Sequence, residues 1–310
     1  MNGHRQEFDI TQAPNNREIS FALTDDLRVV ASDDPASPVL LRFFSGYDRA
    51  FILPDEREEL SGFKACLALN GTYRHAFGRV HAELVAIVED ASGTVLGGAN
   101  FLATTINRGA MQPPASIALN YVYVEAAARG RGLLRIILQA VRMLAARALQ
   151  LNGTGMQPAL FIEQNDPLRL TAEEYAADTA YSGTDQIDRL AIWARLGARV
   201  LDFPYIQPPL SAGQHADDGL IYAAIDYPGE GVDRGLLHDH LESFFRISVL
   251  KGEVELPAGI AGAQLGALAQ CCAPVKLLAI EPAVRWIRAG QPTARFDSFR
   301  ALAAVAEKEG

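Results

Sequence analysis

The pattern of apolar and polar residues along the chain predicts a mixed fold of strands and helices. Apolar runs of strand length alternate with two longer segments whose apolar residues recur at helical spacing. The predicted strands cover residues 83–90, 94–105, 115–125, 158–167, 198–207 and 219–227. The predicted helices cover 132–153, with Gly153 as C-cap, and 184–197, with Thr184 as N-cap. This order predicts an α/β (α+β) domain with one mixed sheet between helices.

The two ends of the chain differ from this middle part. Residues 1–38 are polar with turn signals and predict an N-terminal arm that contains one strand near 26–31. After Pro228 the apolar residues recur at helical spacing and the strand signal is weak. We therefore expect an α/β domain over 39–228 and a C-terminal helical extension over 229–310.

Three shorter segments carry expectations of their own. A helix is expected after Pro54, with acidic residues in its first turn that favour the helix dipole. The polar stretch 168–184 reads as a loop or short helix and is a candidate lid. Cys271 and Cys272 lie in an apolar stretch, where we expect buried packing.

The segment 121–150, YVYVEAAARGRGLLRIILQAVRMLAARALQ, joins a strand directly to a helix through a cluster of glycine and arginine. Glycines at 130 and 132 allow backbone conformations and close approaches that other residues hinder. The first amides of a helix have no partner within it and lie at its positive end. A tight turn with a solvated arginine face is the simpler explanation. The combination also predicts an anion site, although neither the dinucleotide fingerprint nor the P-loop pattern is present.

At this segment the sequence resembles the GNAT superfamily of N-acetyltransferases, whose signature R/Q-x-x-G-x-G/A heads a long helix after a strand. Arg129 and Gly132 match its first two positions, and Leu134 stands where the family has Gly or Ala. The strand ALFIEQND and the later ARLGARV also resemble family elements, so the resemblance covers about residues 40–227. It implies a mixed, mostly antiparallel GNAT-like sheet and an acetyl-CoA (or other acyl-CoA) co-substrate, with no metal.

The resemblance also implies where the coenzyme A would bind. Backbone amides of the motif would hold its pyrophosphate, and an amide of the preceding strand would stabilise the oxyanion of the tetrahedral intermediate. The implied cofactor-binding residues are Val122, Val124, Arg129, Gly130, Arg131, Gly132, Leu133, Leu134, Arg135, Asn165 and Trp193. Trp193 occupies the place where many members have a tyrosine that protonates the leaving thiolate.

Three residues are candidates for the chemistry itself. Glu163, an acid within an apolar strand, is the first choice as general base, although an ordinary structural acid would fit the same pattern. Asn120 lies on the same face as Val122 and Val124 if the strand alternates regularly. Tyr123 is one of several tyrosines, with Tyr175, Tyr181 and Tyr205, that could replace the missing acid.

Composition narrows the range of partners. The chain has 310 residues, 49% of them hydrophobic, and its 28 basic against 37 acidic residues give a net charge of −9. An acidic chain is a poor candidate for nucleic-acid binding. We find no signal peptide, no membrane-spanning run, and no cysteine pattern for disulfides or zinc, and therefore expect a cytoplasmic protein. His238, His240 and Glu242 are expected to be surface residues rather than a metal site.

These observations predict an acyl-CoA-dependent N-acyltransferase that transfers an acyl group directly to the amine of a small or medium-sized acceptor. Two alternatives stay open: a GNAT-fold module that binds acyl-CoA without turnover, and another acyl-CoA chemistry on the same fold, such as decarboxylation. A homodimer is also left open, with the C-terminal extension as a contact or as a cover over the acceptor site.

Overall fold

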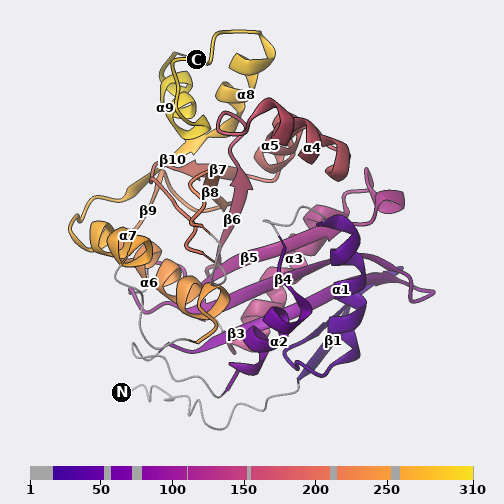
Figure 1. The fold of residues 1–310 in the computed structure, drawn as a ribbon. Helices are drawn as coiled ribbons and strands as arrows, with labels where there is room; N and C mark the ends of the chain where they lie inside the picture. The colour runs from indigo at the N-terminus through magenta and orange to yellow at the C-terminus, as the bar shows by residue number, and fades with distance from the viewer. Residues whose placement is uncertain are drawn as a thin grey trace.

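The computed structural model describes residues 17–51, 57–71, 79–109, 111–151, 155–209, 215–252 and 259–309 (Figure 1). Within them a single sheet runs through the molecule in the strand order β1-β2-β3-β4-β5-β6-β8-β7-β10-β9. The strands are β1 (Glu18–Thr24), β2 (Leu27–Ser32), β3 (His81–Asp90), β4 (Val95–Thr105), β5 (Ala115–Val124), β6 (Ala159–Asn165), β7 (Ala198–Leu201), β8 (Leu220–Ile225), β9 (Gly231–Val232) and β10 (Val275–Ala279).

Neighbouring strands in the sheet are antiparallel at every pairing except that of β5 with β6, which is parallel. A parallel pair needs a crossover connection, and the helix that follows β5 supplies it. The mixed, mostly antiparallel sheet predicted from the sequence is therefore confirmed.

Helices cover both faces of the sheet. They are α1 (Pro38–Ala50), α2 (Leu60–Ala68), α3 (Leu133–Ala148), α4 (Ala172–Ser182), α5 (Gln186–Arg195), α6 (Arg234–Phe244), α7 (Ile260–Ala269), α8 (Ile280–Arg288) and α9 (Phe299–Glu309), with a 3-10 turn η3 (Ala126–Ala128) and a π-helical turn η4 (Phe245–Val249). One apolar core packs α3, α5, α8 and α9 against one face. Two others, beneath α1 and α2 and beneath α6, η4 and α7, cover the opposite face.

Burial on both faces explains why β3 reads as a nearly continuous apolar run. Leu84, Ala86 and Val88 belong to the core under α3, whereas Val85 and Ile87 face α1 and α2. Because successive side chains of a strand point to opposite faces, both sets need an apolar partner. The predicted apolar stripe of α3 is likewise buried; it comprises Leu134, Ile137, Leu138, Val141, Leu144 and Ala145, of which Leu134 is half-buried.

The structure corrects several expectations about the chain ends. Residues 18–32 form two paired strands at the edge of the sheet, and residues 1–16 lie outside the described part. The stretch after Pro228 is not purely helical, because it contains β10, which pairs with β7 and extends the sheet of the predicted domain. The C-terminal segment thus contributes to both faces, with α6 and α7 far from α8 and α9 in Figure 1.

Local boundaries also differ from those predicted. Asp185, not Thr184, caps α5, because its carboxylate accepts the amides of Ile187 and Asp188. The helix expected after Pro54 begins only at Leu60, with residues 52–56 outside the described part. Stretch 168–184 contains α4, which starts with a capping box of Thr171 and Glu174.

Two expectations about the ends of helices also change. Helix α3 ends at Ala148 with Leu149 as its C-cap, and Gly153 lies outside the described part. Cys271 and Cys272 are exposed beyond the end of α7, so the prediction of buried packing was wrong. Among the described helices, none combines the length and apolar character needed to span a bilayer.

Candidate active site

The centre of the sheet opens into a wedge where β5 and β6 part. The two strands pair only from Ser116 opposite Ala159 to Leu119 opposite Ile162. Beyond that point Glu163–Asn165 pair with β8 alone, and Figure 1 shows β6 turning away from β5. Residues 120–124 of β5 consequently have no strand partner on the β6 side. Polar backbone there is left available to a ligand.

A β-bulge at Asn120 changes which side chains face the two sides of this wedge. The pairing of β4 with β5 shifts register between Asn100 opposite Tyr121 and Phe101 opposite Leu119, so Asn120 is the extra residue. Val122 and Val124 pack on the α3 side, whereas the Asn120 side chain points to the opposite face. The prediction that all three share a face was therefore wrong, because strand alternation fails at a bulge.

The backbone of β5 presents amides to the wedge. The amide of Glu125 donates to the carbonyl of Leu96 on β4 at 2.9 Å. Since successive amides of a strand point to opposite sides, those of Val122 and Val124 point toward β6. These are the positions that the sequence predicted for stabilising an oxyanion.

On the α3 face, the wedge is flanked by the glycine and arginine loop. Gly130 and Gly132 both have φ of 75°, and Gly132 is the N-cap of α3 without any side-chain cap. A Cβ at either glycine would meet nothing within 4 Å, so these positions need glycine for the backbone conformation and leave open space above it. The first amides of the helix therefore face space that an anion could occupy.

The arginines of this loop are exposed, and two of them also bind backbone carbonyls. Arg129 donates through Nη1 to Ser182 at 2.9 Å and through Nε to Val124 at 3.3 Å. Arg135 donates to the carbonyl of Arg195 at 2.9 Å. Arg131 is exposed beside them. The loop thus combines free helix-start amides, positive charge and open space, a donor set that fits a pyrophosphate.

Four other predicted cofactor-binding residues have side chains that do not face the open space above the loop. Leu133 and Trp193 are buried, Trp193 in the core that α3 and α5 share. Leu134 is half-buried against the same core. Asn165, at the end of β6, lines the cavity described next rather than the loop.

On the opposite face the wedge opens into a cavity of about 170 Å³. Strands β3 to β6 provide its floor, α2 and the α6–η4 segment provide walls, and Gln207 and Asp217 lie at its edge. Its described lining residues are Phe51, Glu58, Phe63, Cys66, Glu83, Asn100, Asn120, Tyr121, Glu163, Gln164, Asn165, Arg189, Gln207, Asp217, Leu220, Phe244 and Ser248. Among them are four carboxylates and one arginine, and Arg189 is paired with Asp178.

Glu163 lies on the β6 side of this cavity. Its Oε1 accepts the hydroxyl of Tyr205, a residue that follows β7. Burial of the carboxylate raises the pKa of Glu163, the charge of Asp217 raises it further, and the Tyr205 hydrogen bond opposes them, for a pKa of about 7. A carboxylate with this pKa can exchange a proton near neutral pH.

Glu83 is a second acidic residue of the cavity, and the sequence analysis did not identify it. It lies on β3, is 1% exposed, and accepts the side-chain amides of Asn100 at 2.6 Å and Asn120 at 3.1 Å. Burial raises the pKa of Glu83 to about 7 against the effect of these hydrogen bonds. An acid directly before the apolar run 84–88 was the only available signal.

Tyr123, proposed as a proton donor, does not line the cavity. Its hydroxyl donates to the carbonyl of Phe43 at 3.2 Å, within the core under α1. Burial raises the pKa of Tyr123 far above its usual range. Tyr121 is the tyrosine of β5 that lines the cavity, and its ring packs against Tyr47, Phe51 and Phe63.

The C-terminal segment forms part of the cavity wall. Phe244 at the end of α6 and Ser248 in η4 both line it, and the Ser248 hydroxyl accepts the Asn120 side-chain amide at 3.3 Å. Cys66 of α2 lies 3.5 Å from the carbonyl of Ile247, so α2 and η4 meet behind the cavity. The segment beyond the predicted domain is thus built into the site.

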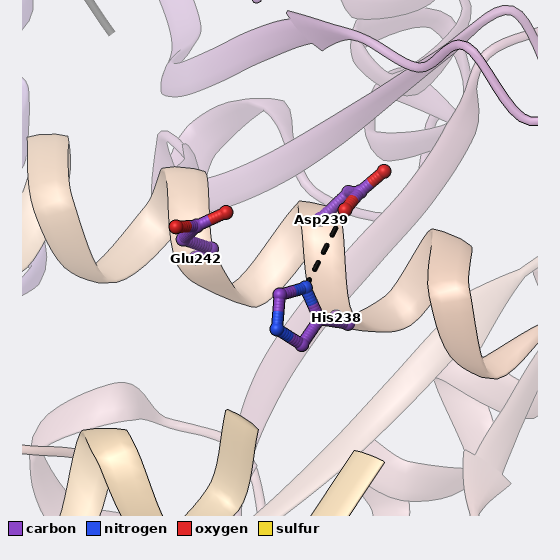
Figure 2. A group of neighbouring side chains, drawn as sticks. All are labelled: His238, Asp239 and Glu242. Atoms are coloured by element: carbon purple, nitrogen blue, oxygen red, sulfur yellow. Dashed lines mark hydrogen bonds and ion pairs between the residues drawn. The ribbon is translucent and has the colours of Figure 1, made fainter. Parts of the chain in front are cut away.

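His238, Asp239 and Glu242 form the described cluster whose spacing would suit a metal ion (Figure 2). Arginines already occupy its carboxylates, since Arg108 donates to Asp239 at 2.7 Å and Arg79 to Glu242 at 3.0 Å. Burial raises the pKa of Asp239, but hydrogen bonds and arginine charges outweigh it and hold the pKa at about 2. The cluster is an ion-pair network.

His240, on the same helix, was expected at the surface. It is 2% exposed, and its Nε2 lies 2.6 Å from the hydroxyl of Tyr222. That expectation was wrong, because the turn of α6 that carries His240 packs onto β6 and β8.

No family model matches the chain, and no curated protein matches it. Solved structures similar to the chain include a GCN5-related N-acetyltransferase from Kribbella flavida, with 23% identity over 64% of this chain and 96% of that one and a TM-score of 0.29. The ribosomal-protein-S18-alanine N-acetyltransferase from Escherichia coli has 15% identity over 65% and 97%, with a TM-score of 0.33. A variant of the spermidine N-acetyltransferase from Vibrio cholerae has 11% identity over 65% and 94%, with a TM-score of 0.35.

Proposed function

We propose that this protein is an acyl-CoA-dependent N-acyltransferase that transfers an acetyl or other short acyl group to the amine of a small acceptor within a ternary complex. The observation that carries the proposal is the wedge between β5 and β6. It has a positively charged helix start on one face of the sheet and an acidic cavity on the other. A long acyl donor can reach from one face of a sheet to the other only where two neighbouring strands are not hydrogen-bonded to each other.

The loop before α3 would hold the phosphates of the donor. Its helix-start amides donate hydrogen bonds along the axis of a positive dipole, and Arg129, Arg131 and Arg135 add charge. Gly130 and Gly132 keep the backbone accessible. In this arrangement the Leu134 side chain stays in the core, so its bulk does not oppose the approach of phosphate.

The unpaired edge of β5 would bind the acyl group. The Val122 and Val124 amides point into the wedge, where either could donate to the carbonyl oxygen of a thioester. Such a fixed donor strengthens as negative charge develops on that oxygen in the tetrahedral intermediate.

Glu163 would remove the proton from the attacking amine. Most amines are ammonium ions near neutral pH, and a base of pKa about 7 is unprotonated in a useful fraction while still able to accept a proton. Tyr205 holds one carboxylate oxygen, which leaves the other for the acceptor. A leaving thiolate has a pKa of about 8.5 and needs no acid, which agrees with the absence of a cavity-facing tyrosine at position 123.

The test is thiol release from acetyl-CoA in the presence of a panel of small amines, with each amine also checked for acylation by mass spectrometry. The proposal requires thiol release that depends on an amine and yields the acylated amine. Binding of coenzyme A without acylation of any amine would favour the non-catalytic acyl-CoA-binding module. Hydrolysis or decarboxylation without amine acylation would favour the other acyl-CoA chemistry.

A further inference from the structure

The acidic cavity contains two buried hydrogen-bond acceptors, Oε2 of Glu83 and Oδ1 of Asn120, to which no described residue donates in standard hydrogen-bond geometry. The Ser248 hydroxyl lies close enough to the Glu83 carboxylate to lower its pKa, but it is neutral and leaves the charge of Glu83 unpaired. Both residues line the cavity. The other carboxylate oxygen of Glu83 and the amide nitrogen of Asn120 are bound to each other, which fixes the two side chains in place.

Two buried acceptors without donors raise the free energy of the folded protein unless a ligand donates hydrogen bonds to them. A buried acceptor left without a donor costs about 1–3 kcal/mol, and more when the group is charged. When Glu83 is ionised, the two orphan atoms are both acceptors, so a group that completes them must supply hydrogen-bond donors and, opposite the carboxylate, positive charge. An ammonium group supplies three donors and one positive charge.

Among the described residues, the cations at this cavity pair with other acids. Lys251 forms an ion pair with Glu58 at 2.9 Å, and Arg189 with Asp178 at 2.6 Å. Within the described ranges, neither Glu83 nor Glu163 takes part in an ion pair. The cavity therefore has two carboxylates free for cationic groups of a ligand.

The two carboxylates approach the reacting position from different sides. Glu83 reaches Asn120 from β3 across β4, whereas Glu163 lies on β6, across the wedge. In the sheet, β3 and β6 are three strand spacings of about 4.8 Å apart, and the side chains of Glu83 and Glu163 line the same cavity between them. The two carboxylates therefore offer separate positions for two amino groups that a short chain joins.

We propose that Glu83 and Asn120 form a second cation-binding subsite, so that the preferred acceptor carries two basic nitrogens on a short aliphatic chain. This inference rests on the proposed function. One nitrogen is bound at Glu83 and Asn120, and the other is placed at Glu163 for acylation. Phe63, Tyr121 and Phe244, which line the cavity, provide apolar contacts for the chain between them.

The test compares a linear four-carbon diamine with the four-carbon monoamine in wild type and in Glu83→Gln. Glutamine retains the size of the side chain and its hydrogen bonds to Asn100 or Asn120 but removes the charge. The ratio of kcat/KM for diamine over monoamine should exceed one in the wild type and fall about 30-fold in the variant, as expected for one charged hydrogen bond. Glu307→Gln, which makes the same charge change in α9, should leave the ratio unchanged.

Calorimetric titration of the diamine without acyl-CoA makes the two proposals separable. Diamine binding that weakens in Glu83→Gln supports the subsite even if no acyl transfer occurs, in which case only the proposed function fails. Acylation of both amines with equal kcat/KM in the wild type, or an equal loss for both in a folded Glu83→Gln, overturns the subsite and leaves the proposed function standing. No diamine binding to the folded wild type also overturns the subsite.

Discussion

The two faces of the wedge are built in different ways. The α3 face is a continuous stretch of chain, residues 129–135, whose glycines, arginines and helix start are adjacent in sequence and exposed. The cavity face is assembled from β3, β4, β5, β6 and η4, and its central carboxylate is almost completely buried. The first is a local anion site. The second is a set of polar groups that only the complete fold brings together.

This difference implies different energetic roles. Exposed arginines at a helix start cost the folded protein little, because water solvates them without ligand. Buried acids whose pKa values are raised to about 7 destabilise the ionised folded protein. The cavity face should therefore show the stability cost that often accompanies a site arranged for function.

Glu163→Gln should lower kcat for amine acylation about 10²–10³-fold, because it removes the proposed general base. Binding of coenzyme A should be unchanged, since the α3 face is intact. Wild-type kcat for a monoamine should fall as pH drops below about 7, where Glu163 becomes protonated, and the variant should lose this step. Steady-state kinetics from about pH 5.5 to about pH 8.5, a range on either side of the pKa of about 7, measure the loss of kcat and its pH dependence. A kcat within threefold of wild type would exclude Glu163 as the base.

Glu83→Gln should stabilise the protein more at pH 8 than at pH 5. The folded protein keeps a proton on Glu83 up to a pKa of about 7, whereas the unfolded chain loses it near 4.5. The free energy of unfolding of the wild type therefore falls by about 3 kcal/mol as pH rises through this window, and the variant lacks this decrease. Thermal unfolding followed by circular dichroism should show a gain of about 5 °C at pH 8. A gain that is independent of pH would contradict the raised pKa.

Arg129→Ala should weaken coenzyme A binding about tenfold, the loss expected for one charge-assisted phosphate contact of about 1.4 kcal/mol. Amine binding measured alone should not change. Arg288→Ala is the matched control, because Arg288 is exposed, pairs with Asp188, and belongs neither to the loop 129–135 nor to the cavity lining. Equal effects of the two substitutions on the Kd would indicate only a general influence of charge.

Ser248→Ala should raise the KM for the acceptor about threefold with little change in kcat. The serine hydroxyl accepts a long hydrogen bond of 3.3 Å from Asn120, and its loss removes a minor support of the cavity. Steady-state kinetics with a saturating acyl donor give both constants. A change in coenzyme A affinity instead of the acceptor KM would contradict the role of Ser248 in the acceptor cavity.

The same contrast explains what could be predicted from the sequence. The order of strands and helices along residues 83–227 and the α3 stripe follow from periodicity and from turn signals, which are local. The loop 129–135 was identified because all its chemistry lies within seven residues. Glu163 was identified because an acid in an apolar strand is conspicuous, and the structure places it in the cavity.

Features that depend on contacts distant in sequence were missed. The bulge at Asn120 is a mismatch between two strands, so it cannot be read from β5 alone, and it reversed the expected facing of Asn120. β10 is five residues within a stretch of helical composition and becomes a strand because β7 offers an unpaired edge. Glu83 and Ser248 are 165 positions apart, yet both line the cavity beside Asn120.

The most direct test of the account is calorimetric titration of coenzyme A into the wild type and into a double variant, Arg129→Glu with Gly132→Asp. Both substitutions place negative charge where the phosphates should bind, and Gly132→Asp also strains a residue with φ of 75°. The account predicts micromolar binding to the wild type and a loss of at least about 100-fold in a folded double variant. Absence of binding to the folded wild type, or equal binding to both proteins, would contradict it.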